Sequence, residues 1–164
     1  MKHISSLVAA RHASALGDIL LAASPRGLAG LWFDGQKHQP DSAAWPLQPS
    51  HPVLVQAMRQ LDEYFAGRRT QFDLPLDLQA GTAFQQGVWR ALLAIPHGAH
   101  CTYGALAQRI DAVRAVRAVG AAVGRNPLSI VVPCHRVLGS TGALTGYAGG
   151  LERKTALLRL EGVL

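Results

Sequence analysis

The first third of the chain alternates short apolar runs with turn residues. The runs cover residues 6–12, 19–23 and 28–33, and Gly17-Asp18 and Ser24-Pro-Arg-Gly27 separate them. Apolar runs of this length between turn signals predict a β-meander. Residues 36–50 hold three prolines and show little periodicity, so we expect a loop there.

A helical period follows this loop. Gly67 is placed to end the helix, because glycine adopts the left-handed conformation at a helix C-terminus. Residues 70–78 fit either a further strand or an extended connection. We place a domain boundary at Gln79-Ala-Gly81, so that residues 1–79 form an α/β scaffold domain and residues 80–164 a second domain. The helix begins near Pro52, and its apolar residues at i, i+4, i+7 and i+11 are Leu54, Met58, Leu61 and Phe65.

Helices dominate the predicted second domain. Thr82 and Gln85 have the spacing of a capping box at the start of a helix that stops before Pro96. Residues 103–110 and 113–123 predict two short helices with a break near Asp111, and such a pair predicts a helix-turn-helix. The buried stripe of the first helix is formed by Val88, Trp89, Leu92 and Leu93.

The last of these helices has a basic face opposite an apolar one. Small alanines let a groove approach the backbone while arginines reach phosphates or bases, so the basic face suits nucleic acid. A solvated helix face explains the same spacing equally well. The basic face consists of Arg114, Arg117, Ala118 and Ala121, and the apolar face of Val116, Val119, Gly120 and Val123.

Composition narrows the function only a little. Sixteen Lys and Arg against ten Asp and Glu give a net charge of +6, which suits a polyanionic partner and also simple solubility. Two cysteines are too few for a disulfide framework. Residues 1–14 lack the apolar core of a signal peptide, and no apolar run approaches membrane-spanning length. We therefore expect a soluble cytoplasmic protein that does not enter the membrane.

The candidate chemistry lies in the segment SIVVPCHR, residues 129–136. We expect an apolar strand at residues 130–132 that ends at Pro133 and presents Cys134 beside His135. A nearby imidazole that accepts the thiol proton generates the nucleophilic thiolate near neutral pH. An inert buried cysteine beside a satisfied histidine is, however, the commoner outcome for an arbitrary Cys-His pair.

Glu161 is the candidate partner of this histidine. Lys154, Leu157, Leu158 and Glu161 fall at i, i+3, i+4 and i+7, so the acid shares a helix face with two leucines. A carboxylate on an apolar face needs a polar partner. We therefore expect Glu161 to hold the imidazole of His135.

Several ordered motifs resemble a known family. The string Val132-Pro-Cys-His-Arg-Val137, preceded by Asn126-Pro127 and followed by Thr145-Gly-Tyr-Ala-Gly-Gly150, resembles the active-site signature of the O6-alkylguanine-DNA alkyltransferases. FQQGVWRALLAIPHG, TYGALA and RAVG extend the similarity over residues 81 to about 162, and EYFAG adds a looser match to bacterial members. The resemblance implies an α/β N-terminal domain, a ribonuclease H-like β-meander with a helix, followed by an α-helical winged helix-turn-helix domain.

The resemblance also implies catalytic roles. Cys134 matches the acceptor thiol and His135 the water-linked base. Glu161 matches the acid that holds this histidine, which agrees with the helix-face argument, and Asn126 matches a residue that supports the turn and its hydrogen bonds.

For the lesion, the resemblance implies a pocket made largely of backbone. Tyr103 helps to rotate the lesion's phosphate and donates a hydrogen bond to guanine N3. Carbonyls of Cys134 and Val137 accept from the guanine amine, and the N–H of Ala148 faces O6. Tyr147 and Lys154 match a position near the pocket and a position of structural support.

On the DNA side, Arg117 matches a finger that enters the base stack after the alkylated base has flipped out. The helix-turn-helix is implied to lie in the minor groove, where Ala118 and Ala121 allow a close approach. Arg114 and Arg125 are placed to meet phosphates. The expected partner is double-stranded DNA containing O6-alkylguanine, bound by a monomer, with cooperative binding left open.

The implied activity is direct-reversal DNA repair. The alkyl group of O6-alkylguanine, and of O4-alkylthymine, passes irreversibly to Cys134 in a single turnover. We expect no cofactor and no metal, since no cysteine-rich cluster precedes the domains. Two other classes stay open: a lesion-binding module without catalysis, against which Cys134 argues, and a cysteine hydrolase, for which no feature specifies an oxyanion hole.

Four residues leave questions open. Asp111 and Val113 stand where relatives usually have Gly and Pro in the helix-turn-helix turn, and Asp111 could also cap the following helix. Ala148 replaces the serine of some relatives, which leaves the preferred adduct size undecided. Cys101 has no family role and is interpreted as a spare thiol near the DNA face, with oxidation sensitivity as a minor alternative.

Overall fold

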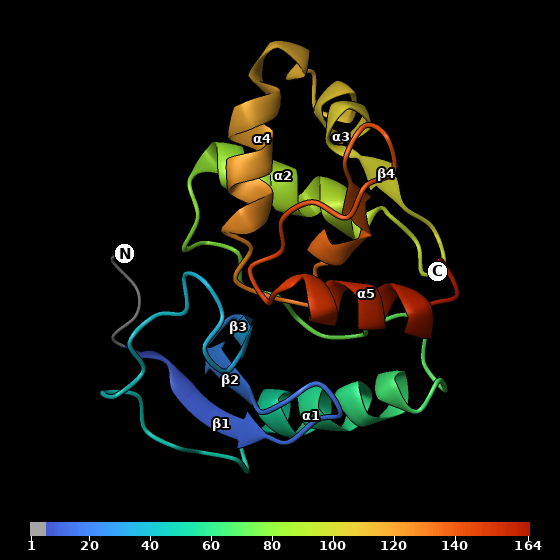
Figure 1. The fold of residues 1–164 in the computed structure, drawn as a ribbon. Helices are drawn as coiled ribbons and strands as arrows, with labels where there is room; N and C mark the ends of the chain where they lie inside the picture. Colours follow the sequence, from blue (N-terminus) through green and yellow to red (C-terminus); the bar gives the residue numbers. More distant parts are fainter. Residues whose placement is uncertain (1–5) are drawn as a thin grey trace. The chain divides into compact units, whose positions relative to one another are not determined.

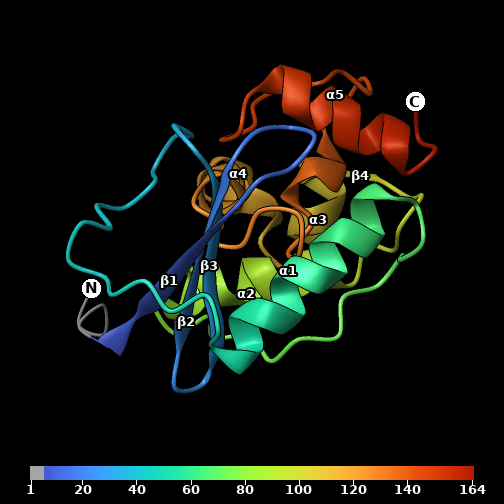
Figure 2. The same cartoon turned by 90° about the horizontal axis from the view of Figure 1, so that it is seen from below.

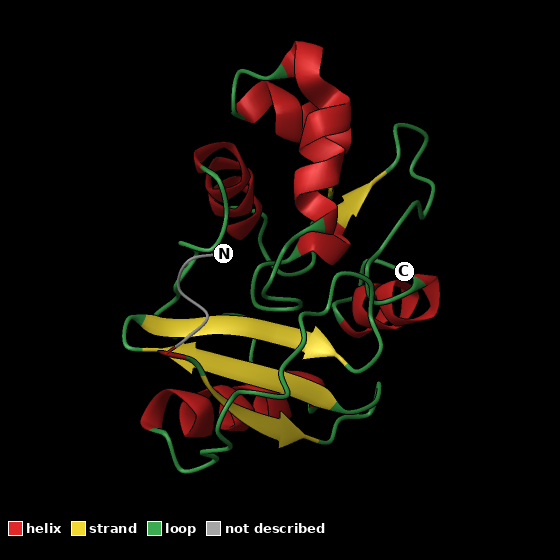
Figure 3. Ribbon diagram, turned by 90° about the vertical axis from the view of Figure 1, so that its left-hand side faces the viewer, coloured by secondary structure: helices red, strands yellow, loops and turns green. Residues whose placement is uncertain are grey.

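Three antiparallel strands form the sheet of the first of two units, Met1–Ala80 and Gly81–Leu164, as the computed structural model in Figure 1 shows. The structure describes residues 6–164, so the first five residues of the predicted scaffold domain lie outside the described residues. The strands are β1 (Val8–His12), β2 (Ile19–Ser24) and β3 (Gly27–Phe33), in the order β1-β2-β3 (Figure 3). The predicted β-meander is therefore present.

Both faces of the central strand are covered. Successive side chains of a strand point to opposite faces, and all six residues of β2 are buried. One face of the sheet is covered by a hydrophobic cluster that includes Leu20, Trp32 and Trp45. The indole rings of the two tryptophans lie with their centroids 5.8 Å apart. Trp45 belongs to the predicted loop. The backbone of Ala9 anchors this loop, because its N–H donates to the carbonyl of Pro46 and its carbonyl accepts from the N–H of Gln48, both at 2.8 Å.

Helix α1 (Pro52–Phe65) packs on this sheet, beside β2 and β3 (Figure 2). Pro52 occupies the first turn, and the side chain of His51 caps it. The predicted helix is present, and Leu54 and Leu61 are the fully buried members of its apolar stripe. Met58 and Phe65 are only half-buried, because the helix turns Ala57 and Tyr64 toward the core beside Leu54 and Leu61.

The segment after α1 is an extended connection and not a fourth strand. It makes a single parallel bridge, between Leu28 and Leu76. Two backbone hydrogen bonds of 2.8 Å support this bridge, from Leu28 to Pro75 and from Asp77 to Leu28. Proline at residue 75 has no N–H to offer a longer ladder.

The second unit is mainly helical. Its helices are α2 (Ala83–Leu93), α3 (Tyr103–Arg109), α4 (Val116–Gly124) and α5 (Leu151–Leu160), and β4 (Cys101–Thr102) pairs in parallel with β5 (Val137–Leu138). The capping box at the start of α2 is formed, since Thr82 and Gln85 each bond the other's backbone N–H. Leu93 is 43% exposed, so its predicted place in the core is wrong. No helix within residues 6–164 has the length and apolar character to cross a membrane.

Helices α3 and α4 form the predicted helix-turn-helix, but the turn is not built as expected. Asp111 has φ 55°, and the N–H groups of Asp111 and Ala112 donate to the carbonyls of Gln108 and Ala107. This is a Schellman motif, so Asp111 closes α3 and does not cap the next helix. A short 3-10 turn at Val113–Ala115 then leads into α4 without a side-chain cap. The α-helix therefore begins three residues later than predicted.

We expect Asp111→Gly to raise the free energy of unfolding by about 0.5–1 kcal/mol, because glycine relieves the left-handed backbone strain at this position. Urea denaturation of the two proteins measures the difference. Asp111→Ala is the matched control and should be less stable than the wild type. A glycine variant less stable than the wild type would show that the Asp111 side chain makes a stabilising contact of its own.

Candidate active site

Cys134 follows a compact turn and not the predicted strand. The N–H of Val132 donates to the carbonyl of Leu128 at 2.9 Å, and the N–H of Cys134 to that of Val132 at 2.8 Å. Ile130 has φ 72°, a conformation that β-branched residues rarely adopt. The apolar residues 130–132 are buried in this turn and do not pair with a strand. The strand prediction was wrong because a buried turn and a buried strand have the same apolar pattern.

The amide of Asn126 holds the turn together. Its Nδ2 donates to the carbonyl of Val132 at 2.7 Å, and its Oδ1 accepts from the N–H of Leu128 at 2.9 Å. The side chain is buried, so these bonds form without competition from bulk water. Asn126 thereby fixes the backbone directly before Pro133 and Cys134.

The Cys134 thiol is almost fully buried, with 5% of the residue exposed, in a 3-10 turn that runs from Cys134 to Arg136 into β5. Burial raises the pKa of Cys134, and a hydrogen bond with Asn126 and the charge of Lys154 offset only part of this shift. The thiol therefore needs a base that removes its proton before it can act as a nucleophile near neutral pH.

His135, the predicted base, is held by Glu161. Its Nε2 lies 2.7 Å from Oε2 of Glu161, and both side chains are buried. Burial lowers the pKa of His135, although the hydrogen bond and charge of Glu161 oppose the shift. The Nδ1 atom is buried and has no hydrogen-bond partner within residues 6–164. A neutral ring that donates from Nε2 to the carboxylate leaves a lone pair on Nδ1 to accept a proton.

Arg136 is a member of the site that sequence reasoning missed. Its Nε donates to Oε1 of Glu161 at 2.7 Å and its Nη2 to Oε2 at 3.0 Å. Its Nη1 donates to the carbonyl of Ile95 at 2.6 Å. The one signal in the sequence was a charged residue next to the apolar Val137, which is weak evidence of a buried ion pair.

Lys154 is fully buried and holds the loop between β5 and α5. Its Nζ donates to the carbonyls of Val137 at 2.6 Å, Thr145 at 2.9 Å and Gly146 at 3.2 Å. Burial lowers the pKa of Lys154 to about 8, and the proximity of Cys134 opposes this shift. The ammonium group thus joins α5 to β5 and to the loop between them.

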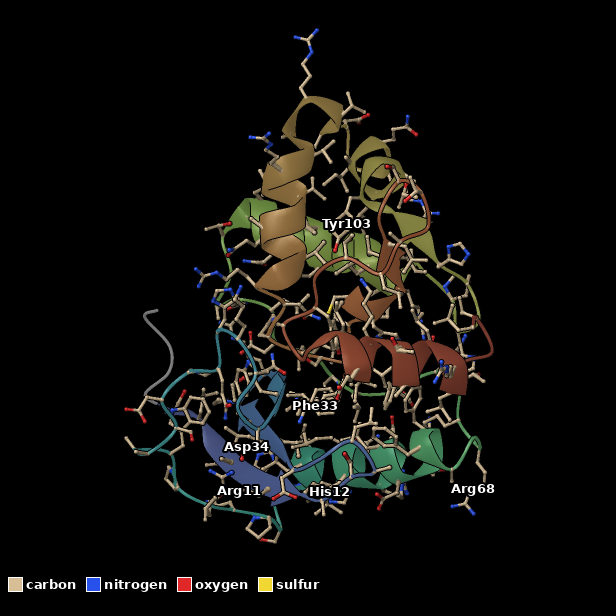
Figure 4. All side chains as sticks on the ribbon, viewed as in Figure 1. Arg11, His12, Phe33, Asp34, Arg68 and Tyr103 are labelled. Atoms are coloured by element: carbon tan, nitrogen blue, oxygen red, sulfur yellow. The ribbon has the colours of Figure 1, made fainter. Side chains whose placement is uncertain are left out.

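Tyr103 reaches the same loop from the start of α3. Its hydroxyl donates to the carbonyl of Thr145 at 3.4 Å, the carbonyl that Lys154 also binds (Tyr103 is labelled in Figure 4). Tyr147 and Ala148 lie farther along this loop and are half-buried. The structure therefore gathers the predicted lesion-binding residues around one segment between β5 and α5.

The predicted DNA-binding residues lie on exposed surface. Val119, Ala122 and Val123 face the core, where Trp89 Nε1 donates to the carbonyl of Ala122 at 2.8 Å. Val116, at the start of the helix, is 37% exposed, so the predicted apolar face is covered only from Val119 onward. The exposed set on or beside α4 is Arg114, Arg117, Ala118, Ala121 and Arg125.

The second thiol has no part in this cluster. Cys101 lies in β4, pairs in register with Val137 of β5 and is buried, and both cysteines are free thiols. Burial raises the pKa of Cys101, with a smaller opposing effect from the charge of Arg109. Within residues 6–164, no group of three or more His, Cys, Asp or Glu side chains is arranged to hold a metal ion.

Comparison with known proteins shows that two domains of one family match this chain. The ribonuclease-like domain of 6-O-methylguanine DNA methyltransferase matches residues 7–78, and the DNA binding domain of the same family matches residues 83–163. A methylated-DNA--protein-cysteine methyltransferase of Mycobacterium leprae is 47% identical over 148 residues, 90% of this chain and 88% of that protein. Its namesake in Methanosarcina barkeri is 48% identical over 149 residues, 90% and 92% of the two chains.

Solved structures agree with these matches. The crystal structure of the Mycobacterium tuberculosis O6-methylguanine methyltransferase has a TM-score of 0.86 and 46% identity, over 94% of this chain and 92% of that one. The structure of M. tuberculosis OGT in complex with DNA has a TM-score of 0.85 and 46% identity, over 95% and 92%. The predicted family and the predicted pairing of a ribonuclease-like domain with a DNA-binding domain are confirmed.

We expect Lys154→Met to lower the free energy of unfolding by about 2–4 kcal/mol, because methionine removes the ammonium donor from three carbonyls and leaves that of Thr145 only the 3.4 Å bond from Tyr103. Guanidinium chloride denaturation measures the loss. Arg159→Met, an exposed change on the same helix, is the control and should have little effect. Equal losses for both variants would show that the ammonium–carbonyl contacts do not stabilise the loop.

Proposed function

The chain belongs to the 6-O-methylguanine DNA methyltransferase family, and we propose that it repairs DNA by moving the alkyl group of O6-alkylguanine to Cys134. The observation that carries the choice of Cys134 is its neighbour: a buried imidazole held by a carboxylate at 2.7 Å, with the other ring nitrogen unengaged. The neighbouring charge that acts on the pKa of Cys101 is that of Arg109, which cannot accept a proton.

The proposed reaction is a single displacement. Nδ1 of His135 accepts the proton of Cys134, directly or through one water, and the thiolate attacks the alkyl carbon. The bond between the alkyl carbon and O6 breaks, and its electron pair stays on the guanine oxygen. The guanine then takes up a proton and is released without its alkyl group. A thioether forms on Cys134. Its sulfur is a poor leaving group for water, so each molecule reacts once.

Lys154 and Tyr103 assist this step in the proposal. Lys154 places a positive charge near the thiolate, which favours the ionised form of Cys134. Its bonds also fix the carbonyl of Val137, the proposed acceptor for the guanine amine. Tyr103, held against the same loop, donates to guanine N3 as negative charge develops on the ring, and the N–H of Ala148 faces O6.

The proposed substrate form is a base flipped out of double-stranded DNA, because the alkyl carbon is inaccessible inside the duplex. The exposed Arg117, Ala118 and Ala121 of α4 support contact with DNA, and the M. tuberculosis OGT structure in complex with DNA supports DNA as the partner. Arg117 is proposed to occupy the space that the flipped base leaves in the base stack. Reaction with O4-alkylthymine, a monomeric state and a cytoplasmic location belong to the same proposal.

We expect one methyl group on Cys134, and no second turnover, when the protein meets excess O6-methylguanine duplex. Intact-protein mass spectrometry with peptide mapping measures this. Cys134→Ser should stay unmodified, and Cys101→Ser should react like the wild type. A folded wild type that binds the duplex without an adduct would indicate a lesion-binding module, and catalytic turnover of an activated ester would indicate a hydrolase.

We expect Arg117→Ala to slow repair of duplex DNA about tenfold or more, a loss of about 1.4 kcal/mol in the transition state, while reaction with free O6-benzylguanine stays near the wild-type rate. Single-turnover kinetics with both substrates measures the contrast. Arg114→Ala is the matched control, and it should mainly weaken binding and reduce its salt dependence. Equal losses on duplex and free base would refute the role of Arg117 in base flipping.

A further inference from the structure

Arg136 binds the carboxylate of Glu161, the acid that holds His135, through two hydrogen bonds. Its fork takes both oxygens of Glu161, at 2.7 Å and 3.0 Å, while His135 shares Oε2 at 2.7 Å. All three side chains are buried, so none of the charges is screened by bulk water. The arginine is held in turn by the carbonyl of Ile95 at 2.6 Å.

We propose that Arg136 is a positioning residue for the transfer reaction: it holds the His135–Glu161 pair in the form that carries one proton, on Nε2. Nδ1 then remains free to accept the proton of Cys134. This inference rests on the proposed function, because it explains how the base of that reaction is kept ready.

The charge of the cluster supports the inference. A carboxylate removed from water tends to bind a proton unless a positive charge or hydrogen-bond donors compensate it. Arg136 supplies both, and the charge of the Arg136–Glu161 pair is then zero. Without the guanidinium, the His135–Glu161 pair would bind a second proton, either as imidazolium or as a protonated acid beside the other tautomer of the ring. In both forms Nδ1 carries a hydrogen and cannot act as a base.

The charged and titratable groups near His135 come from two elements. Glu161 and Lys154 face it from α5, and Arg136 and Cys134 belong to its own turn. The charges of Arg136 and Lys154 both disfavour an imidazolium, whereas Glu161 favours it. Lys154 is already engaged with three carbonyls, so the fork of Arg136 is the group that addresses the carboxylate itself.

The direct test is the protonation state of the His135 ring, read by ¹⁵N NMR in wild type, Arg136→Gln and Arg136→Lys. The wild type at neutral pH should show a proton on Nε2 and none on Nδ1. Arg136→Gln should show a proton on Nδ1, whereas Arg136→Lys, which keeps the charge, should resemble the wild type. A wild-type ring protonated at Nδ1, or a folded Arg136→Gln ring without that proton, would overturn the inference.

A second readout is the pH profile of Cys134 alkylation by iodoacetamide in a Cys101→Ser background. The extra proton of Arg136→Gln must leave first, so the midpoint should move up by about one pH unit, a loss of about tenfold at pH 7. Arg159→Gln removes one positive charge from an exposed position and should not move the midpoint. A merely structural role would lower the rate at every pH without moving the midpoint, and would contradict the inference.

These outcomes separate the inference from the function on which it rests. If Arg136→Gln does not fold, the wild-type ring and Arg136→Lys still decide the matter. A wild type with the predicted ring state that takes no methyl group from O6-methylguanine DNA would refute the proposed function and leave the role of Arg136 standing. A wild type that does take the group but carries a proton on Nδ1 would refute Arg136 alone.

Discussion

The carboxylate of Glu161 lies 2.7 Å from Nε2 of His135 and accepts two hydrogen bonds from Arg136 inside the second unit. A buried carboxylate is unfavourable by several kcal/mol unless donors replace the lost water, so this acid requires both partners to be in place. Because Glu161 ends α5 and Arg136 also binds the carbonyl of Ile95, one contact set orders three segments. Cys134, the thiol that is proposed to react, directly precedes His135 in the chain.

Helix α5 contributes two opposite charges to the interior. Lys154 and Glu161 lie seven residues apart, about two helical turns, and therefore share a face with Leu157 and Leu158. The lysine holds the loop that is proposed to receive the base, and the glutamate holds the proposed proton acceptor. A shift of this helix would therefore disturb both groups at once.

Sequence reasoning succeeded where the local pattern determines the structure. The meander, the capping box of Thr82 and Gln85 and the shared face of Lys154 and Glu161 all follow from spacing and turn chemistry. It failed where tertiary contacts override the pattern. The apolar run at residues 130–132 folds into a turn because the amide of Asn126 binds its backbone, and a strand and a buried turn have the same composition.

The other failures have physical causes as well. Asp111 looked like a helix cap, yet the backbone there requires a left-handed residue, which a sequence does not display. Leu93 was expected in the core because it is apolar, although exposed leucines are common on folded surfaces. The sequence motif contains Arg136 but gives it no role, because only the structure shows that it binds Glu161.

The measurement that tests this account most directly is the rate of alkyl transfer from free O6-benzylguanine to Glu161→Gln, with folding checked by circular dichroism. The glutamine matches the acid in shape but cannot hold His135 and Arg136 by charge. The account predicts a folded protein whose transfer at pH 7 is slowed by about a hundredfold or more, in the range of a lost general base. A folded Glu161→Gln protein that reacts at the wild-type rate would contradict it.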